Sequence, residues 1–270
     1  MGAPHLGGEK HPGGRCSSRS APRWSPTHAS HASQPYQRRR DCSSIAHDYA
    51  ENMPAVARRQ SDLRVCFFGD SFTVGVGDPS GVGWVGRVAA AARAHGHDLT
   101  AYNLGVRRDT SLDLSSRWLG EARGRLKDGD LFAVVFAFGI NDVDVQLGLR
   151  RVPRDRSLSL LADMLAGARA VRWPALVIGP PSVLDRETSE RAADLAAGME
   201  QVCTSRGVPF VDVTAKLGAD PIWRQEVAAG DAFHPSTRGY AQLATLIAPP
   251  ILQWLTELLR GRRNVMCPGD

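Results

Sequence analysis

From residue 63 onward, the sequence alternates short apolar runs with longer segments in which apolar residues recur at helical spacing. Consecutive apolar residues indicate strands that are buried on both faces, which is typical of a parallel sheet covered by helices. This pattern predicts an α/β fold with a five-stranded parallel sheet, and the most hydrophobic strand, 130–139, is expected at its centre. We expect the strands at 63–68, 99–104, 130–139, 175–180 and 208–213, and the helices at 83–96, 111–126, 156–171, 187–207 and 234–259.

The first 60 residues differ in composition from the rest of the chain. They are rich in Ser, Pro, Gly, His and Arg and contain few aliphatic residues, so they cannot bury enough apolar surface to fold. We therefore expect a disordered basic tail over 1–60, a folded domain over 61–262 and a C-terminal tail over 263–270. Met53 lies just before the first patterned segment and is a candidate alternative start.

Charge and cysteine content exclude several function classes. The net charge of +5 comes from the first 60 residues, because residues 61–270 contain 24 basic and 24 acidic side chains. A neutral domain lacks the basic footprint of a nucleic-acid-binding protein. The cysteines show neither disulfide nor zinc spacing, and Cys66 and Cys203 are expected to be buried free thiols.

Targeting and cofactor signals are also missing from the sequence. No run approaches the ~18 apolar residues of a membrane span, the first residues lack the apolar core of a signal peptide, and no Walker lysine follows the first strand. These features predict a cytoplasmic protein with no integral membrane segment, no metal and no other cofactor. They predict no particular oligomeric state.

Polar motifs directly follow the first three predicted strands, and a fourth lies past the fifth strand, just ahead of the last helix. These motifs are GDS (69–71), NLGVRRDT (103–110), GIND (139–142) and GDAFHP (230–235). The carboxyl ends of parallel strands meet at one edge of the sheet, where ligands bind in folds of this class. We therefore expect the four segments to form one site.

Within this set, Ser71 is a candidate nucleophile, His234 its general base and Asp231 the carboxylate that orients the base. A serine hydroxyl becomes a good nucleophile only when a base removes its proton, and the base needs an orienting acid. Asp231 stands three residues before His234, a spacing that can bring its carboxylate to Nδ1 and leave Nε2 facing Ser71. Candidate donors to a developing oxyanion are the Asn141 amide and the backbone N–H groups of Ser71 and the 105–108 loop.

Each motif also has a purely structural interpretation. Gly-Asp-Ser at 69–71 is a common turn sequence. Residues 139–142 fit an Asx turn that closes the third strand, and Asp231 fits a helix cap. The occurrence of all four segments, in this chain order and at one edge of one sheet, favours a site over independent turns.

The motifs resemble the four sequence blocks of the GDSL (SGNH) esterase/lipase family, and the likeness covers about residues 63–260. The resemblance implies a three-layer α/β/α flavodoxin-like fold, with Ser71 as nucleophile, His234 as base and Asp231 as the partner of the base. It also implies oxyanion donors at Ser71, at Asn141 and at a glycine of the second block.

The second block departs from the family pattern, in which many members read Asn-x-Gly-x-x-Gly-Asp-Thr. Aligned on Asn103 and Asp109-Thr110, this chain has Gly105 at the first glycine but Arg108 at the second. The backbone donor is therefore assigned to Arg108 or Gly105, although arginine resists the positive φ that glycine adopts.

Other residues near the motifs have two interpretations each. Arg107 and Arg108 are candidates either to bind an acidic part of the substrate or to pair with Asp109 or Asp113. Large aromatic residues near the motifs are candidates for an acyl pocket or for the core, and the core is the favoured interpretation: Phe72, Trp84, Phe138, Trp223 and Phe233. Segments 143–156, 181–188 and 217–230 are expected to cover the site as loops.

Two expectations concern the last helix. Ser236 or Thr237 is predicted to supply its N-cap, since both side chains can accept a hydrogen bond from the first turn. Pro249 and Pro250 are predicted to kink or split it, because proline has no N–H to donate.

Together these features predict a serine hydrolase that cleaves carboxylic esters of small molecules through an acyl-enzyme, with thioesters and lysophospholipids as further candidate substrates. An acyltransferase or a carbohydrate O-deacetylase with the same triad is a near alternative. A catalytically idle binding protein on the same scaffold, or an adaptor that contacts anionic surfaces through the basic tail, is an alternative of another class.

Overall fold

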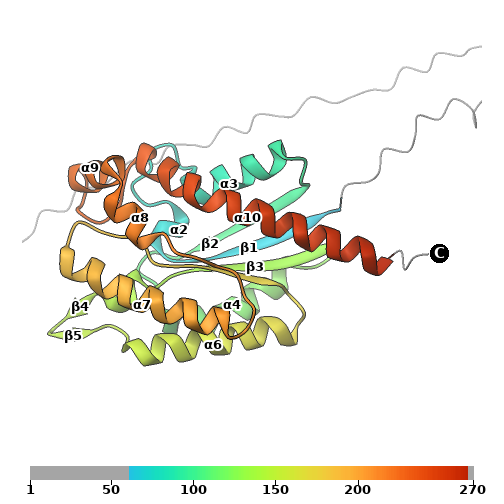
Figure 1. The fold of residues 1–270 in the computed structure, drawn as a ribbon, viewed down its shortest axis with the longest axis horizontal. Coiled ribbons are helices and arrows are strands. Elements are labelled where there is room, and N and C mark those ends of the chain that lie inside the picture. Colours follow the sequence, from blue (N-terminus) through green and yellow to red (C-terminus); the bar gives the residue numbers. More distant parts are fainter. Residues whose placement is uncertain (1–60, 267–270) are drawn as a thin grey trace, which may run out of the picture. The chain divides into compact units, whose positions relative to one another are not determined.

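The computed structural model describes residues 61–266, with a five-stranded parallel sheet at their centre (Figure 1). The strand order is β2-β1-β3-β6-β7, so the most hydrophobic strand lies in the middle, as predicted. The predicted tail over 1–60, with Met53, lies outside the described residues. The strands of this sheet are β1 (Leu63–Gly69), β2 (Leu99–Gly105), β3 (Leu131–Ala137), β6 (Ala175–Ile178) and β7 (Phe210–Val211).

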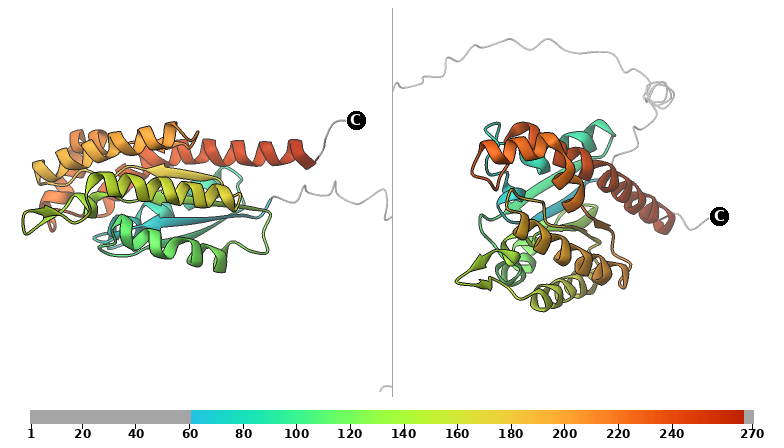
Figure 2. Two further views of the ribbon diagram at one scale, coloured as in Figure 1. Left: turned by 90° about the horizontal axis from the view of Figure 1, so that it is seen from below. Right: turned by 60° about the vertical axis from the view of Figure 1, so that its left-hand side comes forward.

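Helices cover both faces of the sheet and give the three-layer α/β/α architecture. α3 and α10 pack together on one face, while α4, α6 and α7 lie side by side on the other, where Figure 2 shows them from below. A short hairpin, β4 (Val145–Gln146) and β5 (Leu149–Arg150), precedes α6. The helices are α2 (Ser71–Val74), α3 (Gly83–Ala94), α4 (Ser111–Arg125), α5 (Ile140–Val143), α6 (Arg154–Ala170), α7 (Arg186–Thr204), α8 (Thr214–Ala219), α9 (Pro221–Ala229) and α10 (Thr237–Met266).

The last two strands of the sheet are shorter than predicted. β6 ends at Ile178, because Gly179 and two prolines follow and proline cannot continue the ladder. β7 contains only Phe210 and Val211, since Pro209 before it has no N–H to donate. After β7, the Asp212 side chain accepts from the Thr214 N–H at 2.9 Å, and the chain turns into α8.

Of the two predicted effects of Pro249 and Pro250, a kink or a split, the split does not occur, because α10 continues through both residues. Pro249 is exposed and Pro250 is half-buried, so neither belongs to the fully buried face of the helix. Ile247 and Ile251, which flank the prolines on that face, are fully buried. Packing of this face holds the helix together where the prolines remove two backbone bonds. Within residues 61–266, no helix combines the length and apolar character needed to cross a bilayer.

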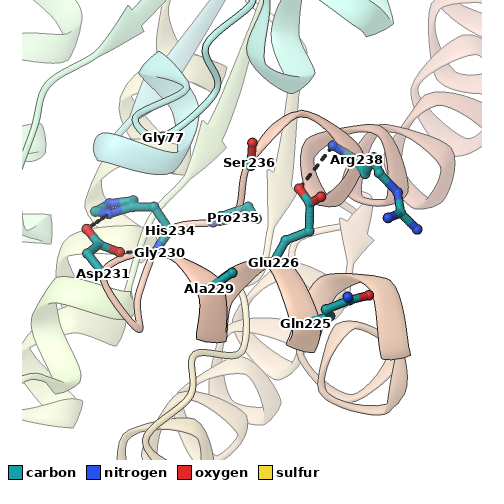
Figure 3. Close-up of a pocket in the computed structure, with 10 residues that line it drawn as sticks. All are labelled: Gly77, Gln225, Glu226, Ala229, Gly230, Asp231, His234, Pro235, Ser236 and Arg238. Atoms are coloured by element: carbon teal, nitrogen blue, oxygen red, sulfur yellow. Dashed lines mark hydrogen bonds and ion pairs between the residues drawn. The ribbon is translucent and has the colours of Figure 1, made fainter.

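The N-terminus of α10 is capped from a distance rather than by Ser236 or Thr237. The Glu226 carboxylate accepts hydrogen bonds from the N–H groups of Arg238 and Gly239, both at 3.1 Å. Figure 3 shows Glu226 reaching Arg238 from the neighbouring helix α9. The Thr237 hydroxyl instead donates to Asp78 at 2.8 Å, which ties the start of α10 to the loop after α2.

Part of the segment 217–230, predicted as a loop, is helical. Leu217 to Ala219 complete α8, and α9 covers Pro221 to Ala229. Asp220 caps α9 by accepting from the Trp223 N–H at 2.8 Å, and Pro221 occupies its first turn. Asp followed by Pro is a helix-start signal that the sequence contained.

Helix α2 lies directly on the ends of β1, β2 and β3, and two glycines make this contact possible. A Cβ on Gly69 would lie 2.1 Å from Thr73 Oγ1 and 2.2 Å from the carbonyl oxygen of Ala137. A Cβ on Gly105 would lie 2.3 Å from the backbone nitrogen of Val74. Because backbone atoms cannot move away as a flexible side chain can, only glycine fits at either strand end.

We expect Gly69→Ala to lower the free energy of unfolding by about 1–3 kcal/mol, because the added methyl group overlaps backbone that the sheet fixes. Gly120→Ala is the matched control: it lies exposed inside α4 with open space around it, and alanine should stabilise it by about 0.5–1 kcal/mol. Urea unfolding of both variants measures the difference. Equal free energies of unfolding for Gly69→Ala and the wild type would contradict the close contact at Gly69.

Candidate active site

Ser71, His234 and Asp231 form one chain of hydrogen bonds at the carboxyl edge of the sheet. His234 Nε2 lies 2.8 Å from Ser71 Oγ, and His234 Nδ1 lies 2.7 Å from Asp231 Oδ2. The serine and the histidine are buried, while the Asp231 side chain is 50% exposed. This arrangement lets the imidazole accept the serine proton while the carboxylate stabilises the imidazolium that results.

Ser71 is held at the first position of α2. The Asp70 side chain caps this helix by accepting from the Phe72 N–H at 2.9 Å, and Gly75 ends it in a left-handed conformation. The N–H of Ser71 has no hydrogen-bond partner within the described part of the chain. The N–H of Ser71 is thus available to a ligand, while its hydroxyl is bonded to His234.

Asp231 holds His234 through its main chain as well as its side chain. Asp231 Oδ1 accepts from the N–H groups of Phe233 at 3.0 Å and His234 at 2.7 Å, while Oδ2 faces the imidazole (Figure 3). Burial would raise the pKa of Asp231, but these hydrogen bonds outweigh it and lower the pKa to about 2. The carboxylate is therefore charged at neutral pH.

Two aromatic rings flank the imidazole and fix its plane. The Phe72 ring centroid lies 4.9 Å from that of His234, and the Phe233 centroid lies 5.1 Å away. Phe72 also stacks on Trp223 at 6.1 Å. No local pattern indicated the contact of Phe72 with His234, because it joins segments far apart in the chain.

Most of the large aromatic residues near the motifs belong to the core, which was the favoured interpretation of the sequence. Phe72, Trp84, Phe138 and Trp223 are buried in the core, whereas Phe233 is partly exposed and lines the cavity beside Ser71. Cys66 and Cys203 are buried free thiols, as predicted.

Asn141 faces the same cavity as Ser71 from helix α5. Its amide donates to the main-chain oxygen of Asp109 at 2.9 Å, and the amide nitrogen carries a second hydrogen for a ligand. This contact joins α5 to the loop after β2, so Asn141 does not form the local Asx turn considered for 139–142. Asp142 anchors α5 by accepting from the Ser111 N–H at 2.8 Å and the Ser157 hydroxyl at 2.6 Å.

The loop after β2 presents Arg108, not Gly105, to the cavity. The Gly105 N–H donates to the Asn103 side chain at 3.1 Å and is therefore occupied. The Asp109 N–H bonds to the Val106 carbonyl at 3.2 Å, and Arg108, at the third position of this turn, has φ +71°. That geometry fits a type II turn, which costs a non-glycine residue roughly 1–2 kcal/mol. The Arg108 N–H has no partner among the described residues.

A neighbouring arginine fixes this loop. Arg117 pairs with Asp109 at 2.7 Å and donates to the carbonyls of Gly69 at 3.1 Å and Leu104 at 3.0 Å. The Asp113 side chain in turn bonds to Thr110 within the capping box of α4. One interpretation of the sequence was that Arg107 or Arg108 pairs with one of these aspartates. Within residues 61–266, neither arginine forms such a pair.

The cavity beside Ser71 has a volume of about 290 Å³ and a basic wall. Two further hollows share His234 or Asp231 with it: one of about 540 Å³, shown in Figure 3, and one of about 480 Å³ beside Leu184. The segments 143–156, 181–188 and 217–230 each contribute to these walls, as expected. The residues that line the cavity beside the serine are Ser71, Arg107, Arg108, Asn141, Asp144, Arg151, Asp231, Phe233 and His234.

Arg151 belongs to this wall, and the sequence did not reveal it. It lies just after β5, and its Nη2 donates to the Arg108 carbonyl at 2.9 Å. Within residues 61–266, no three His, Cys, Asp or Glu side chains are grouped so that they could hold a metal ion.

The chain is similar to known proteins in sequence and in structure. A family model described as the GDSL-like Lipase/Acylhydrolase family matches residues 67–242. The fold is similar to that of a lipase/acylhydrolase from Enterococcus faecalis, with 24% sequence identity, a TM-score of 0.58, and 70% of this chain and 95% of that chain covered. None of the curated proteins matches the sequence significantly.

Two other solved structures share the fold. One is a catalytic mutant of an acetylxylan esterase from Geobacillus stearothermophilus, with 21% identity, a TM-score of 0.56, and 69% of this chain and 93% of that chain covered. The other is an alpha/beta hydrolase enzyme from the metagenome of Lake Arreo, with 23% identity, a TM-score of 0.57, and 72% and 97% covered.

The buried Asp70 carboxyl makes the free energy of unfolding depend on pH. Burial raises the pKa of Asp70 to about 7 from an ordinary value of 3.8. The unfolded chain therefore loses this proton first, and stability falls as pH rises from about 4 to 7. At about 1.4 kcal/mol for each pKa unit, the loss is on the order of 4 kcal/mol.

We expect Asp70→Asn to remove this part of the pH dependence, so that the difference in unfolding free energy between pH 5 and pH 8 shrinks. Asp163→Asn, at an exposed position on α6, is the control and should keep the wild-type dependence. Urea unfolding at the two pH values measures the difference. An unchanged slope in Asp70→Asn would mean that this carboxyl is already ionised in the fold.

Proposed function

The chain belongs to the GDSL-like lipase/acylhydrolase family of carboxylic ester hydrolases, and we propose that it acts through an acyl-enzyme formed on Ser71. The observation that carries this proposal is the continuous hydrogen-bonded chain from Ser71 Oγ through His234 to Asp231, at 2.8 and 2.7 Å. A buried serine hydroxyl hydrogen-bonded to an oriented imidazole is the arrangement that activates a nucleophile.

In the first step, His234 Nε2 takes the proton of Ser71 as Oγ attacks the ester carbonyl carbon. The imidazolium then gives this proton to the alcohol oxygen as the ester bond breaks, which leaves the acyl group on Ser71. In the second step, His234 takes a proton from water, which attacks the acyl carbon, and returns that proton to Ser71. Asp231 stays ionised throughout and stabilises the imidazolium.

The oxyanion that forms in each step would be held by three donors. These are the N–H groups of Ser71 and Arg108, both without a partner in the described chain, and the second amide hydrogen of Asn141. Donors that are already in place act without reorganisation when the charge develops. Gly105 is not among them, since its N–H is bound to Asn103.

The similar structures support these roles. The acetylxylan esterase is represented by catalytic mutants in which a serine, a histidine and an aspartate are each replaced by alanine. That aspartate lies three residues before the histidine, the spacing of Asp231 and His234 here.

The size of the cavity favours a short acyl group. A volume of about 290 Å³ lies at the lower end of small-ligand sites. Removal of a short acyl group from a carbohydrate, or its transfer to another alcohol, remains compatible with the same triad. Product analysis by mass spectrometry with acetylated sugars and added alcohols would separate hydrolysis, deacetylation and transfer.

An activated serine should react with a fluorophosphonate probe. We expect stoichiometric labelling at Ser71, located by peptide mass spectrometry, and a fall in labelling rate of at least about 10³-fold in His234→Ala. Ser71→Ala should remain folded and unlabelled. Intact, folded wild-type protein that resists the probe would favour the binding-protein alternative.

Loss of the side-chain oxyanion donor should affect turnover more than binding. We expect Asn141→Ala to lower kcat by about 10²–10³ and to change KM little, because the oxyanion exists only in the transition state. Steady-state kinetics with a short-chain 4-nitrophenyl ester, with thermal unfolding as a control for the lost Asp109 contact, measures this. A rise in KM at constant kcat would instead assign Asn141 to ground-state binding.

A further inference from the structure

We infer that the esters hydrolysed by this enzyme carry an anionic group close to the scissile bond, bound by Arg107, Arg108 and Arg151. This inference rests on the proposed function, because it concerns the substrate of the same Ser71 site. All three arginines line the cavity that contains Ser71 and Asn141.

The three guanidinium groups form no ion pair with the described chain, and the charge of Arg151 acts to lower the pKa of Asp113 and Asp142 only from a longer distance. Within residues 61–266, none of them lies within 4.0 Å of a carboxylate oxygen. Arg107 and Arg108 donate no side-chain hydrogen bond to the described chain, and Arg151 donates only to the Arg108 carbonyl. Guanidinium groups without partners on a concave surface attract anions, which they bind in a bidentate manner.

The carboxylates near these three arginines bind other groups of the protein. Asp109 pairs with Arg117, and Asp231 pairs with His234. Asp113 accepts from the Thr110 hydroxyl at 2.7 Å. Asp144 is the remaining carboxylate of this cavity, and it accepts from Gln146 at 3.1 Å. Three cations therefore face one carboxylate that is not part of the catalytic triad.

The backbone at Arg108 is a second observation that points to a ligand. An arginine occupies the positive-φ position of the turn, where glycine would be unstrained, and its side chain forms part of the cavity wall. Arg151 spans this turn by bonding to the Arg108 carbonyl. Backbone strain of this kind clusters at active sites and ligand-binding segments.

The chemistry of the ligand follows from these groups. Arginine recognises carboxylate, phosphate and sulfate oxygens through paired N–H donors. A cavity of about 290 Å³ that contains both the arginines and Ser71 requires the anion to lie only a few bonds from the ester carbonyl. The anion can belong to the acyl part or to the alcohol part of the ester.

Two pairs of matched esters test this inference. For the alcohol side, 4-acetoxybenzoate is compared with neutral 4-acetoxybenzamide. For the acyl side, 4-nitrophenyl hydrogen glutarate is compared with neutral 4-nitrophenyl valerate. We expect the anionic member of at least one pair to have a kcat/KM about tenfold or more above that of its neutral partner, and high NaCl to reduce this preference.

Arginine variants locate the anion site. Arg107→Gln should lower the anionic-to-neutral ratio about tenfold, and Arg151→Gln should lower it as well. Arg123→Gln, which removes the same charge from an exposed position near the far end of α4, is the control and should keep the wild-type ratio. Arg107 makes no side-chain bond to the described chain, so its replacement should not impair folding.

The outcomes are distinct. A ratio near one for both ester pairs in an active enzyme, or an unchanged ratio in both Arg107→Gln and Arg151→Gln, overturns the anion site. Failure of the proposed function would look different, because no ester would be hydrolysed and the fluorophosphonate probe would leave Ser71 unmodified.

Discussion

The close contact between helix α2 and the ends of three strands determines the rest of the site. Gly69 and Gly105 end β1 and β2 in the same register, and the absence of their side chains lets α2 lie flat on the sheet edge. The Asn103 side chain reinforces the contact by donating to the Thr73 carbonyl at 2.9 Å. Ser71 therefore occupies a fixed position, from which its distances to base and oxyanion donors are defined.

Polar groups around Ser71 form a connected network rather than a set of separate contacts. Arg117 holds Asp109, the Asp109 carbonyl holds the Asn141 amide, and Asp142 beside Asn141 holds the starts of α4 and α6. Most of these buried groups have partners, which favours a stable polar network in a protein interior, although the Ser111 hydroxyl has none within residues 61–266. The N–H groups of Ser71 and Arg108, two residues that line the cavity, have no partner in the described chain and are thus preorganised for a ligand.

The sequence was sufficient to predict the parallel sheet, its central strand and the edge at which polar residues gather, because these follow from hydrophobic patterning and chain direction alone. It failed where a distant contact overrides a local signal. Pro249 and Pro250 remain within α10 because of packing on its other face, and Glu226 replaces Ser236 as the cap of that helix. The positions of Phe72 against His234 and of Arg151 against Arg108 depend on tertiary geometry, so no local pattern could indicate them.

The nucleophile and its base lie 163 residues apart in the chain, at opposite ends of the order in which the fold is synthesised. The serine segment leaves the ribosome early, whereas the segment that contains Asp231 and His234 emerges only after all five strands of the sheet and the helices α2 to α9. In a nascent chain that has not yet reached His234, Ser71 therefore lacks its general base. The pairing of hydroxyl and imidazole therefore requires the segment just before α10, a helix that packs against α3 in the folded domain.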